Sequence, residues 1–112
     1  VKLEMKPVIA DQIPLSKSAL LAVREGMRAV TTRGTAASVF RVPGIVPVAG
    51  KTGTVQTRSG DRFNKASQHA WFIGYGPFDG EPKDVVVIGV LVERGVGGAV
   101  GAAPIARDVF VK

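Results

Sequence analysis

The longest uninterrupted apolar run of the chain, at residues 85–92, contains only valine, isoleucine, leucine and one glycine. Such residues favour β-strands, and the run is far shorter than the roughly 20 residues that cross a bilayer as a helix. We therefore predict a strand over 85–92. Because the run is apolar on both faces, we expect both faces to be covered.

Two further strands are predicted upstream of this run. Residues 70–75 form one, which ends at Gly76-Pro77, and the turn signals within 79–84 indicate that it reverses into the strand at 85–92 as an antiparallel neighbour. Residues 48–56 form the other, in which apolar β-formers flank the polar residues 51–54.

The strand at 48–56 also carries candidate functional groups. Gly50 and Gly53 would weaken a purely structural strand, so we expect another group to lie against this backbone. Alternation puts Lys51 on one side and the two threonines on the other, but the twist of an edge strand can bring a long lysine and neighbouring hydroxyls to one ligand. One cation, two hydroxyls and exposed backbone groups suit an extended peptide that ends in a carboxylate.

Amphipathic helices are predicted before and after the strands. The first begins at the N-cap Ser16, ends at Gly34, and repeats apolar residues at three- and four-residue steps, namely Leu20, Val23, Met27 and Val30. The second has Pro104 in its first turn and three apolar side chains that we expect to face inward, namely Ile105, Val109 and Phe110. The order helix, three strands, helix predicts a single α+β domain with helices packed on a sheet.

The remaining segments are predicted as connections. Residues 1–15 form an extended entry, and 34–47 lead into the strand at 48–56 without a further element. The polar segment 57–69 is too long for a tight hairpin and suits a functional loop as well as a solvated one. Residues 95–101 fit a flexible turn, since the third glycine of a dinucleotide-binding pattern falls on Val100.

Composition and motifs exclude several classes of function. The net charge of +6 favours acidic partners, but the basic residues are scattered and only 6% of residues are aromatic, which argues against nucleic-acid binding. The absence of cysteine and the single histidine, His69, exclude thiolate chemistry and a cysteine or histidine metal site, and we expect no cofactor. Gly50-Lys51-Thr52 is not a phosphate loop, because five residues separate Gly44 from Gly50 where the pattern has four.

The motif Lys51-Thr52-Gly53-Thr54 resembles the third motif of the penicillin-recognising serine enzymes. Its surroundings extend the likeness from about Leu15 to the last helix. They resemble the end of a class B penicillin-binding protein transpeptidase domain, most closely of the elongation type. The segments that carry this resemblance are 23–30, 34–36, 49–56 and 69–75.

The resemblance implies a five-stranded antiparallel sheet between helices, of which this chain would hold three strands. It implies a serine that attacks the penultimate D-Ala of a peptidoglycan stem peptide, an acyl-enzyme that an amine of a neighbouring stem resolves, and β-lactams that acylate the same serine. By motif position, Lys51 would supply positive charge and part of the proton network. Thr52 and Thr54 would hold the substrate carboxylate, Gly53 would leave room for the ligand, and the Thr54 backbone N–H would be an oxyanion donor.

The family's two other motifs are missing from the sequence. None of the five serines begins Ser-x-x-Lys or Ser-x-Asn. We therefore expect residues 1–112 to be the C-terminal portion of a transpeptidase domain, inactive alone, with the N-terminal part of that domain as its partner. The family location is the periplasmic or extracytoplasmic face of the bacterial cell membrane; no signal peptide opens the chain.

Two alternatives remain open at this point. A small basic module could capture peptide carboxylates at the strand edge without any chemistry. A related β-lactamase or D,D-carboxypeptidase would carry the same Lys-Thr-Gly strand.

Overall fold

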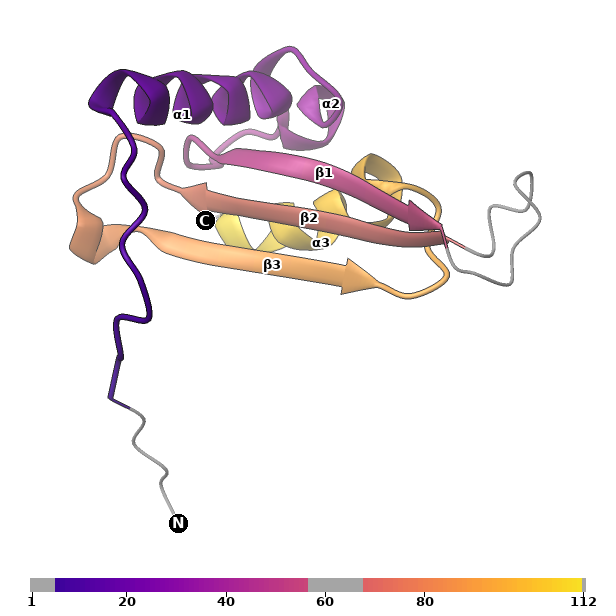
Figure 1. Cartoon of the computed structure of the whole chain (residues 1–112). Coiled ribbons are helices and arrows are strands. Elements are labelled where there is room, and N and C mark those ends of the chain that lie inside the picture. Colours follow the sequence, from indigo (N-terminus) through magenta and orange to yellow (C-terminus); the bar gives the residue numbers. More distant parts are fainter. Residues whose placement is uncertain (1–5, 57–67, 112) are drawn as a thin grey trace.

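A computed structural model describes residues 6–56 and 68–111. Three strands form one sheet in the order β1-β2-β3, with β1 at Ala49–Gln56, β2 at Gln68–Gly76 and β3 at Val86–Val92 (Figure 1). Both pairs are antiparallel, as predicted. A short 3₁₀ helix, η2, at Pro82–Asp84 lies in the turn between β2 and β3. The predicted connection at 57–69 falls largely outside the described residues, as do residues 1–5 of the entry segment.

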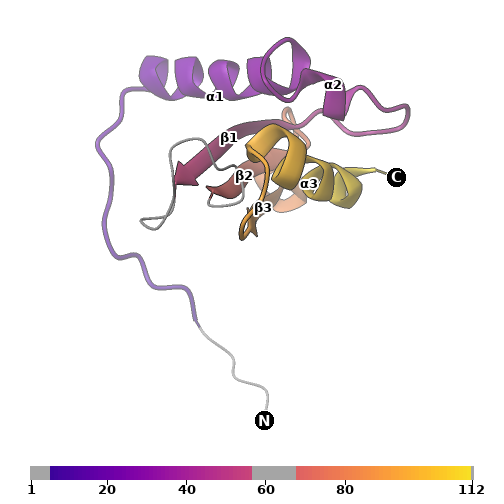
Figure 2. The same cartoon turned by 90° about the vertical axis from the view of Figure 1, so that its right-hand side faces the viewer.

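Helix α1, Lys17–Thr32, crosses beside the start of β1 and contacts that strand (Figure 2). The predicted N-cap is confirmed, since the Ser16 hydroxyl accepts a hydrogen bond from the Ala19 amide at 3.2 Å. After the helix ends, the Gly34 amide donates to the Ala29 carbonyl at 2.8 Å. The first half of α1 is exposed, and only its second half packs on the body of the protein.

A four-residue helix, α2 at Ala37–Phe40, interrupts the predicted connection at 34–47. A single turn is too short to give a periodic apolar pattern. Phe40 nevertheless anchors the core, because its ring stacks on that of the fully buried Phe72 with the centroids 5.4 Å apart.

Helix α3, Ala103–Phe110, covers the face of the sheet that carries Phe72 and Val90. A π-helical turn, η3 at Gly98–Ala102, leads into it and takes the place of most of the flexible turn predicted at 95–101. The prediction that Ile105 and Val109 face inward is wrong: both side chains are at least half exposed, whereas Phe110 is buried as expected. Small residues contact the sheet instead and let the helix approach it closely, namely Ala103 and Ala106.

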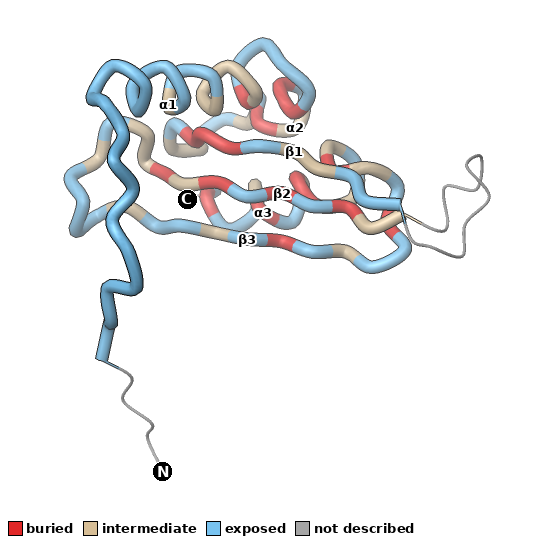
Figure 3. Tube along the Cα trace, viewed as in Figure 1, coloured by how far each residue is buried: buried red, intermediate tan, exposed pale blue. Residues whose placement is uncertain are grey.

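None of the elements that the structure describes covers the opposite face of the sheet. Val87 is 79% exposed, and Leu91, Ile73 and Trp71 are exposed on the same face. Figure 3 shows exposed stretches along the strands. The prediction that both faces of β3 are covered is therefore wrong for residues 6–56 and 68–111. The apolar run at 85–92 correctly predicts a strand. However, the described residues cover only the face that carries Val90.

Candidate functional site

The site is built on the free edge of β1. In an antiparallel ladder, the N–H and C=O groups of successive residues point alternately toward and away from the paired strand. The Val48 carbonyl points away from β2, because it accepts a hydrogen bond from Arg28 Nη1 on α1 at 2.8 Å. The same parity directs the backbone groups of Thr52 and Thr54 to the free edge. Among the described residues, β2 is the only strand that pairs with β1.

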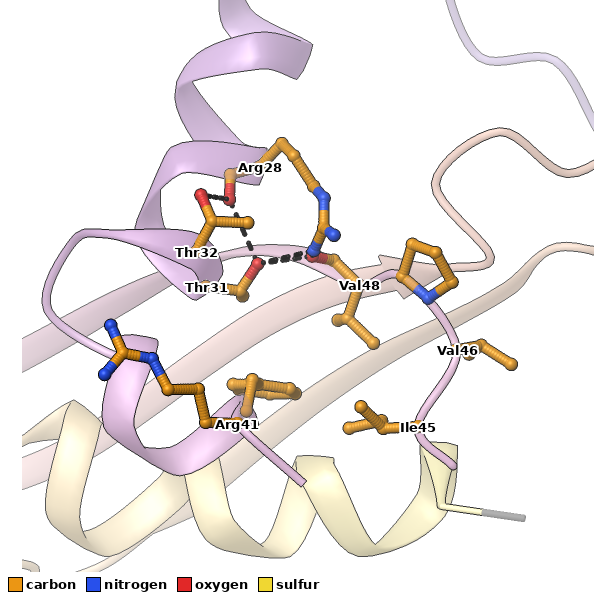
Figure 4. A pocket seen from close by; sticks show the side chains of 9 residues that line it. Arg28, Thr31, Thr32, Arg41, Ile45, Val46 and Val48 are labelled. Carbon is orange, nitrogen blue, oxygen red and sulfur yellow. Dashed lines mark hydrogen bonds between the residues drawn. The ribbon is translucent and has the colours of Figure 1, made fainter. Parts of the chain in front are cut away.

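Helix α1 occupies only the first part of this edge. Arg28 and Thr31 both bind the Val48 carbonyl, and they line a cavity of ≈ 250 Å³ where α1, α2 and the segment before β1 meet (Figure 4). The hydroxyl of Thr31, which is 3% exposed, is shared among Arg28 and Val48 groups, so its polar atoms are already satisfied. The residues that line this cavity therefore have a structural role, because the hydrogen bonds of Arg28 and Thr31 hold α1 against the start of β1.

The open part of the edge borders a groove with a volume of ≈ 270 Å³. Three of the four predicted site residues line it, namely Thr52, Gly53 and Thr54. The opposite wall consists of Gly97, Gly98, Ala99 and Val100, and Thr35 lies at the same groove. The strand therefore presents two hydroxyls and two outward-facing backbone positions to one groove.

Lys51 does not line the groove. It pairs with Ile73 in the sheet, so its side chain leaves the strand on the face opposite the two threonines. Its long side chain nevertheless turns to the free edge, where Nζ donates to the Thr52 carbonyl at 2.6 Å. The ammonium group thus lies beside the backbone of Thr52 and is exposed to solvent.

Both threonine hydroxyls are oriented by the surrounding chain. The Thr35 and Thr52 Oγ1 atoms are 2.9 Å apart and share a hydrogen bond. The Gly98 amide donates to Thr54 Oγ1 at 3.3 Å. Because that bond uses an acceptor position of Thr54, the hydroxyl proton of Thr54 stays available to a ligand.

Three glycines at or near the site lie close to different neighbouring groups. A Cβ at Gly98 would lie 2.5 Å from the Trp71 carbonyl oxygen and 2.7 Å from the Gly53 nitrogen, so the π-helical turn can lie on β1 only with glycine there. Gly50 packs against the Phe72 ring, which is a core contact and not a space for a ligand. Among the described residues, a Cβ at Gly53 would meet only the Trp71 Cβ, at 3.3 Å.

Sequence reasoning missed the contributions of Thr35 and Gly98 to the groove. The sequence alone places Thr35 within the segment 34–36 and Gly98 within a turn, with no sign that either reaches the strand at 48–56. The close approach of Gly98 to β1 depends on tertiary packing, for which a Gly-Gly pair is the single local signal.

Metal and membrane sites find no support in the described residues. Residues 6–56 and 68–111 hold no group of three or more potential metal ligands from histidine, cysteine, aspartate and glutamate. None of their helices has the length and apolar character needed to cross a bilayer. His69 Nδ1 accepts a hydrogen bond from the Arg94 amide at 3.2 Å, away from the groove, which favours a structural role for this histidine over a role as a catalytic base.

Comparison with known proteins gives one consistent result. Residues 2–111 match the family model described as the penicillin binding protein transpeptidase domain. The chain is 40% identical over 72 residues to the peptidoglycan D,D-transpeptidase MrdA of Haemophilus influenzae, a match that covers 56% of this chain and 11% of that protein. It is 37% identical over 97 residues to MrdA of Acinetobacter baumannii, covering 79% of this chain and 14% of that protein.

The fold is also similar to a solved structure. A chain from a peptidoglycan synthase complex, described as coordinating polymerization and crosslinking, superimposes with a TM-score of 0.70 at 37% identity. The match covers 88% of this chain and 16% of that one. The chain therefore spans 11% to 16% of the length of these relatives.

Proposed function

Because the chain belongs to the penicillin-binding protein transpeptidase domain family, we propose that it is the C-terminal portion of a class B peptidoglycan D,D-transpeptidase of the elongation type. In this proposal the chain supplies the wall of the active site that binds the donor stem peptide. The identity of 37–40% to two proteins named MrdA supports the choice of parent enzyme.

One observation carries the proposed role of the site. The open half of the β1 edge presents the backbone groups and hydroxyls of Thr52 and Thr54 at a single groove, and the Lys51 ammonium lies beside the Thr52 backbone. An extended peptide can add to such an edge by main-chain hydrogen bonds, and a charge-assisted pair can hold its terminal carboxylate. This arrangement suits the D-Ala-D-Ala end of a stem peptide better than a compact ligand.

Each residue has a defined part in the proposed reaction. The Thr52 and Thr54 hydroxyls donate to the substrate carboxylate, and Lys51 supplies positive charge beside it. The scissile carbonyl lies along the strand edge, where the Thr54 backbone N–H stabilises the oxyanion of the tetrahedral intermediate. Loss of one such donor costs about 3 kcal/mol of barrier stabilisation in other acyl-transfer enzymes.

The nucleophile comes from outside this sequence. Its serine would attack the carbonyl carbon of the penultimate D-Ala, and the peptide bond to the last D-Ala would break, so that D-Ala leaves as the amine and an acyl-serine ester forms. An amine of a neighbouring stem would then displace the serine oxygen and form the cross-link. β-Lactams would acylate the same serine through ring opening, at the face of the membrane where peptidoglycan is assembled.

The N-terminal part of the domain would complete the sheet and the site. The uncovered apolar face, including Val87, Leu91 and Ile73, supports a cover provided by that part. Its strands would extend the sheet toward the five that the family resemblance implies, and it would carry the Ser-x-x-Lys and Ser-x-Asn motifs.

Labelling with a fluorescent penicillin tests this function. The complete protein should become labelled on a serine outside residues 1–112, whereas the isolated chain should take up no covalent label. Pre-incubation with an unlabelled β-lactam should block labelling of the complete protein. Labelling of the isolated chain, or none of the complete protein, would overturn the proposal; rapid release of the label would indicate a β-lactamase instead.

A further inference from the structure

Thr35 belongs to none of the three strands, yet its hydroxyl reaches the proposed carboxylate site. It follows α1 by three residues and lies 17 residues before Thr52 in the sequence. The fold brings the two Oγ1 atoms to 2.9 Å, and both side chains line the groove. Thr35 is exposed, so this hydrogen bond contributes little to the core.

The hydrogen bond between these residues controls where hydroxyl protons point. Each threonine has one O–H donor and two acceptor positions. A single hydrogen bond between the two oxygens uses one proton and leaves the other available. If Thr35 donates, Thr52 is free to donate to a carboxylate; if Thr52 donates, Thr35 has the free proton at the same groove.

The hydroxyl of Thr54, the second one on the strand, is oriented in a similar way by Gly98 on the opposite wall of the groove. Thr54 Oγ1 accepts from the Gly98 amide, which holds its oxygen as an acceptor and frees its proton. The groove therefore offers two hydroxyl donors whose orientations are set before any ligand arrives: one from Thr54, one from the Thr35–Thr52 pair. Preorganised donors of this kind bind an anion without the loss of rotamer freedom that free hydroxyls would suffer.

We propose that Thr35 is a positioning residue that sets the donor orientation of Thr52 and thereby the preference of the site for substrates with a free terminal carboxylate. This inference rests on the proposed function. It adds a specificity determinant contributed by the loop after α1, outside the Lys-Thr-Gly strand itself.

The test measures carboxylate discrimination in the complete transpeptidase. The probes are two otherwise identical donor peptides ending in D-Ala-D-Ala, one as the free acid and one as the C-terminal carboxamide. The discrimination is the ratio of the two values of kcat/KM for release of the terminal residue. Thr35→Val removes the hydroxyl and keeps the shape, Thr35→Ser keeps the hydroxyl, and Thr32→Val is the control, since Thr32 is exposed near the end of α1 and does not line the groove.

Thr35→Val should lower the acid-over-amide ratio about five- to tenfold, the size expected for one lost hydrogen bond. Thr35→Ser should keep the ratio within about twofold of the parent value, and Thr32→Val should leave it unchanged. An unchanged ratio in Thr35→Val, or an equal loss of kcat/KM for both peptides, would overturn the inference, because the second result marks a merely structural role.

Failure of the proposed function would look different. In that case the parent protein would show no preference for the acid, or Thr52→Val would retain the full preference. If Thr52→Val loses the preference while Thr35→Val keeps it, the proposed function stands and the inference about Thr35 is wrong.

Discussion

Arg28 on α1 donates from Nη1 to the backbone carbonyl of Val48, 2.8 Å away, at the point where β1 begins. Thr31, one turn later, binds the same carbonyl with its hydroxyl. The two side chains attach the helix to the edge strand and leave the rest of that edge open. The stability of this attachment and the chemistry of the open edge can be tested separately.

Thr31→Val should weaken the attachment without altering the groove. The substitution keeps the shape of a buried side chain but removes a hydroxyl that bonds to the Val48 and Arg28 groups. We expect the free energy of unfolding of the complete domain to fall by about 1–3 kcal/mol. Urea unfolding of the purified domain measures this. Thr32→Val, which alters an exposed hydroxyl, should change the value by less than about 0.5 kcal/mol, and equal losses in both variants would contradict the assignment.

Thr52→Val and Lys51→Ala should each slow acylation while leaving the fold intact. Both residues lie at the open edge, and neither side chain belongs to the core. Loss of a hydrogen bond or charge to a carboxylate amounts to about 1.5–3 kcal/mol, so acylation by a labelled penicillin should slow by about 10- to 150-fold. Stopped-flow or quenched labelling measures the rate. Lys83→Ala, in the exposed turn at Pro82–Asp84, is the matched control for charge and should acylate at the parent rate.

Gly98→Ala should displace the wall of the groove. The added methyl would lie 2.5 Å from the Trp71 carbonyl oxygen and 2.7 Å from the Gly53 backbone, none of which can move without disturbing the sheet. We expect a loss of about 1–3 kcal/mol in stability together with slower acylation. Gly26→Ala is the control: no atom of residues 6–56 or 68–111 lies within 4 Å of the added methyl, and alanine should stabilise this helix position by about 0.5–1 kcal/mol. Unchanged stability in Gly98→Ala would show that η3 does not pack closely on β1.

Gly50→Ala should destabilise the core through Phe72. The new methyl would overlap the Phe72 ring, which itself stacks on Phe40. In a double-mutant cycle, Phe72→Leu should relieve part of the strain, so the two substitutions together should cost less than the sum of their separate effects by about 0.5–3 kcal/mol. Denaturant unfolding of the four proteins measures the coupling, and strict additivity would mean that Gly50 is required for another reason.

The sequence predicted those elements whose signals are local. Ser16 marks the start of α1 because its side chain caps the first turn, and the apolar run at 85–92 marks β3 because β-branched residues favour extended backbone. The inward face of α3 was mispredicted, since apolarity alone ranked Ile105 above Ala106, whereas the short distance between helix and sheet selects alanine.

The groove depends on contacts that no local pattern encodes. Thr52 and Thr54 could be nominated from their own strand, but Thr35 and Gly98 reach them only after the chain has folded, across 17 and 44 residues of sequence. The expectation that β3 is covered on both sides failed for a similar reason, because the sequence records the character of a face and not which polypeptide lies on it.

The attachment of α1 to Val48 also limits how far a foreign strand can extend along β1. Its carbonyl is already taken by Arg28 and Thr31, and the next residue of the same parity, Gly50, is buried, so the accessible outward-facing backbone groups run from Thr52 toward Gln56. The helix thus limits how far a guest strand can extend toward the start of β1, and it shields this part of the strand edge from pairing with other molecules.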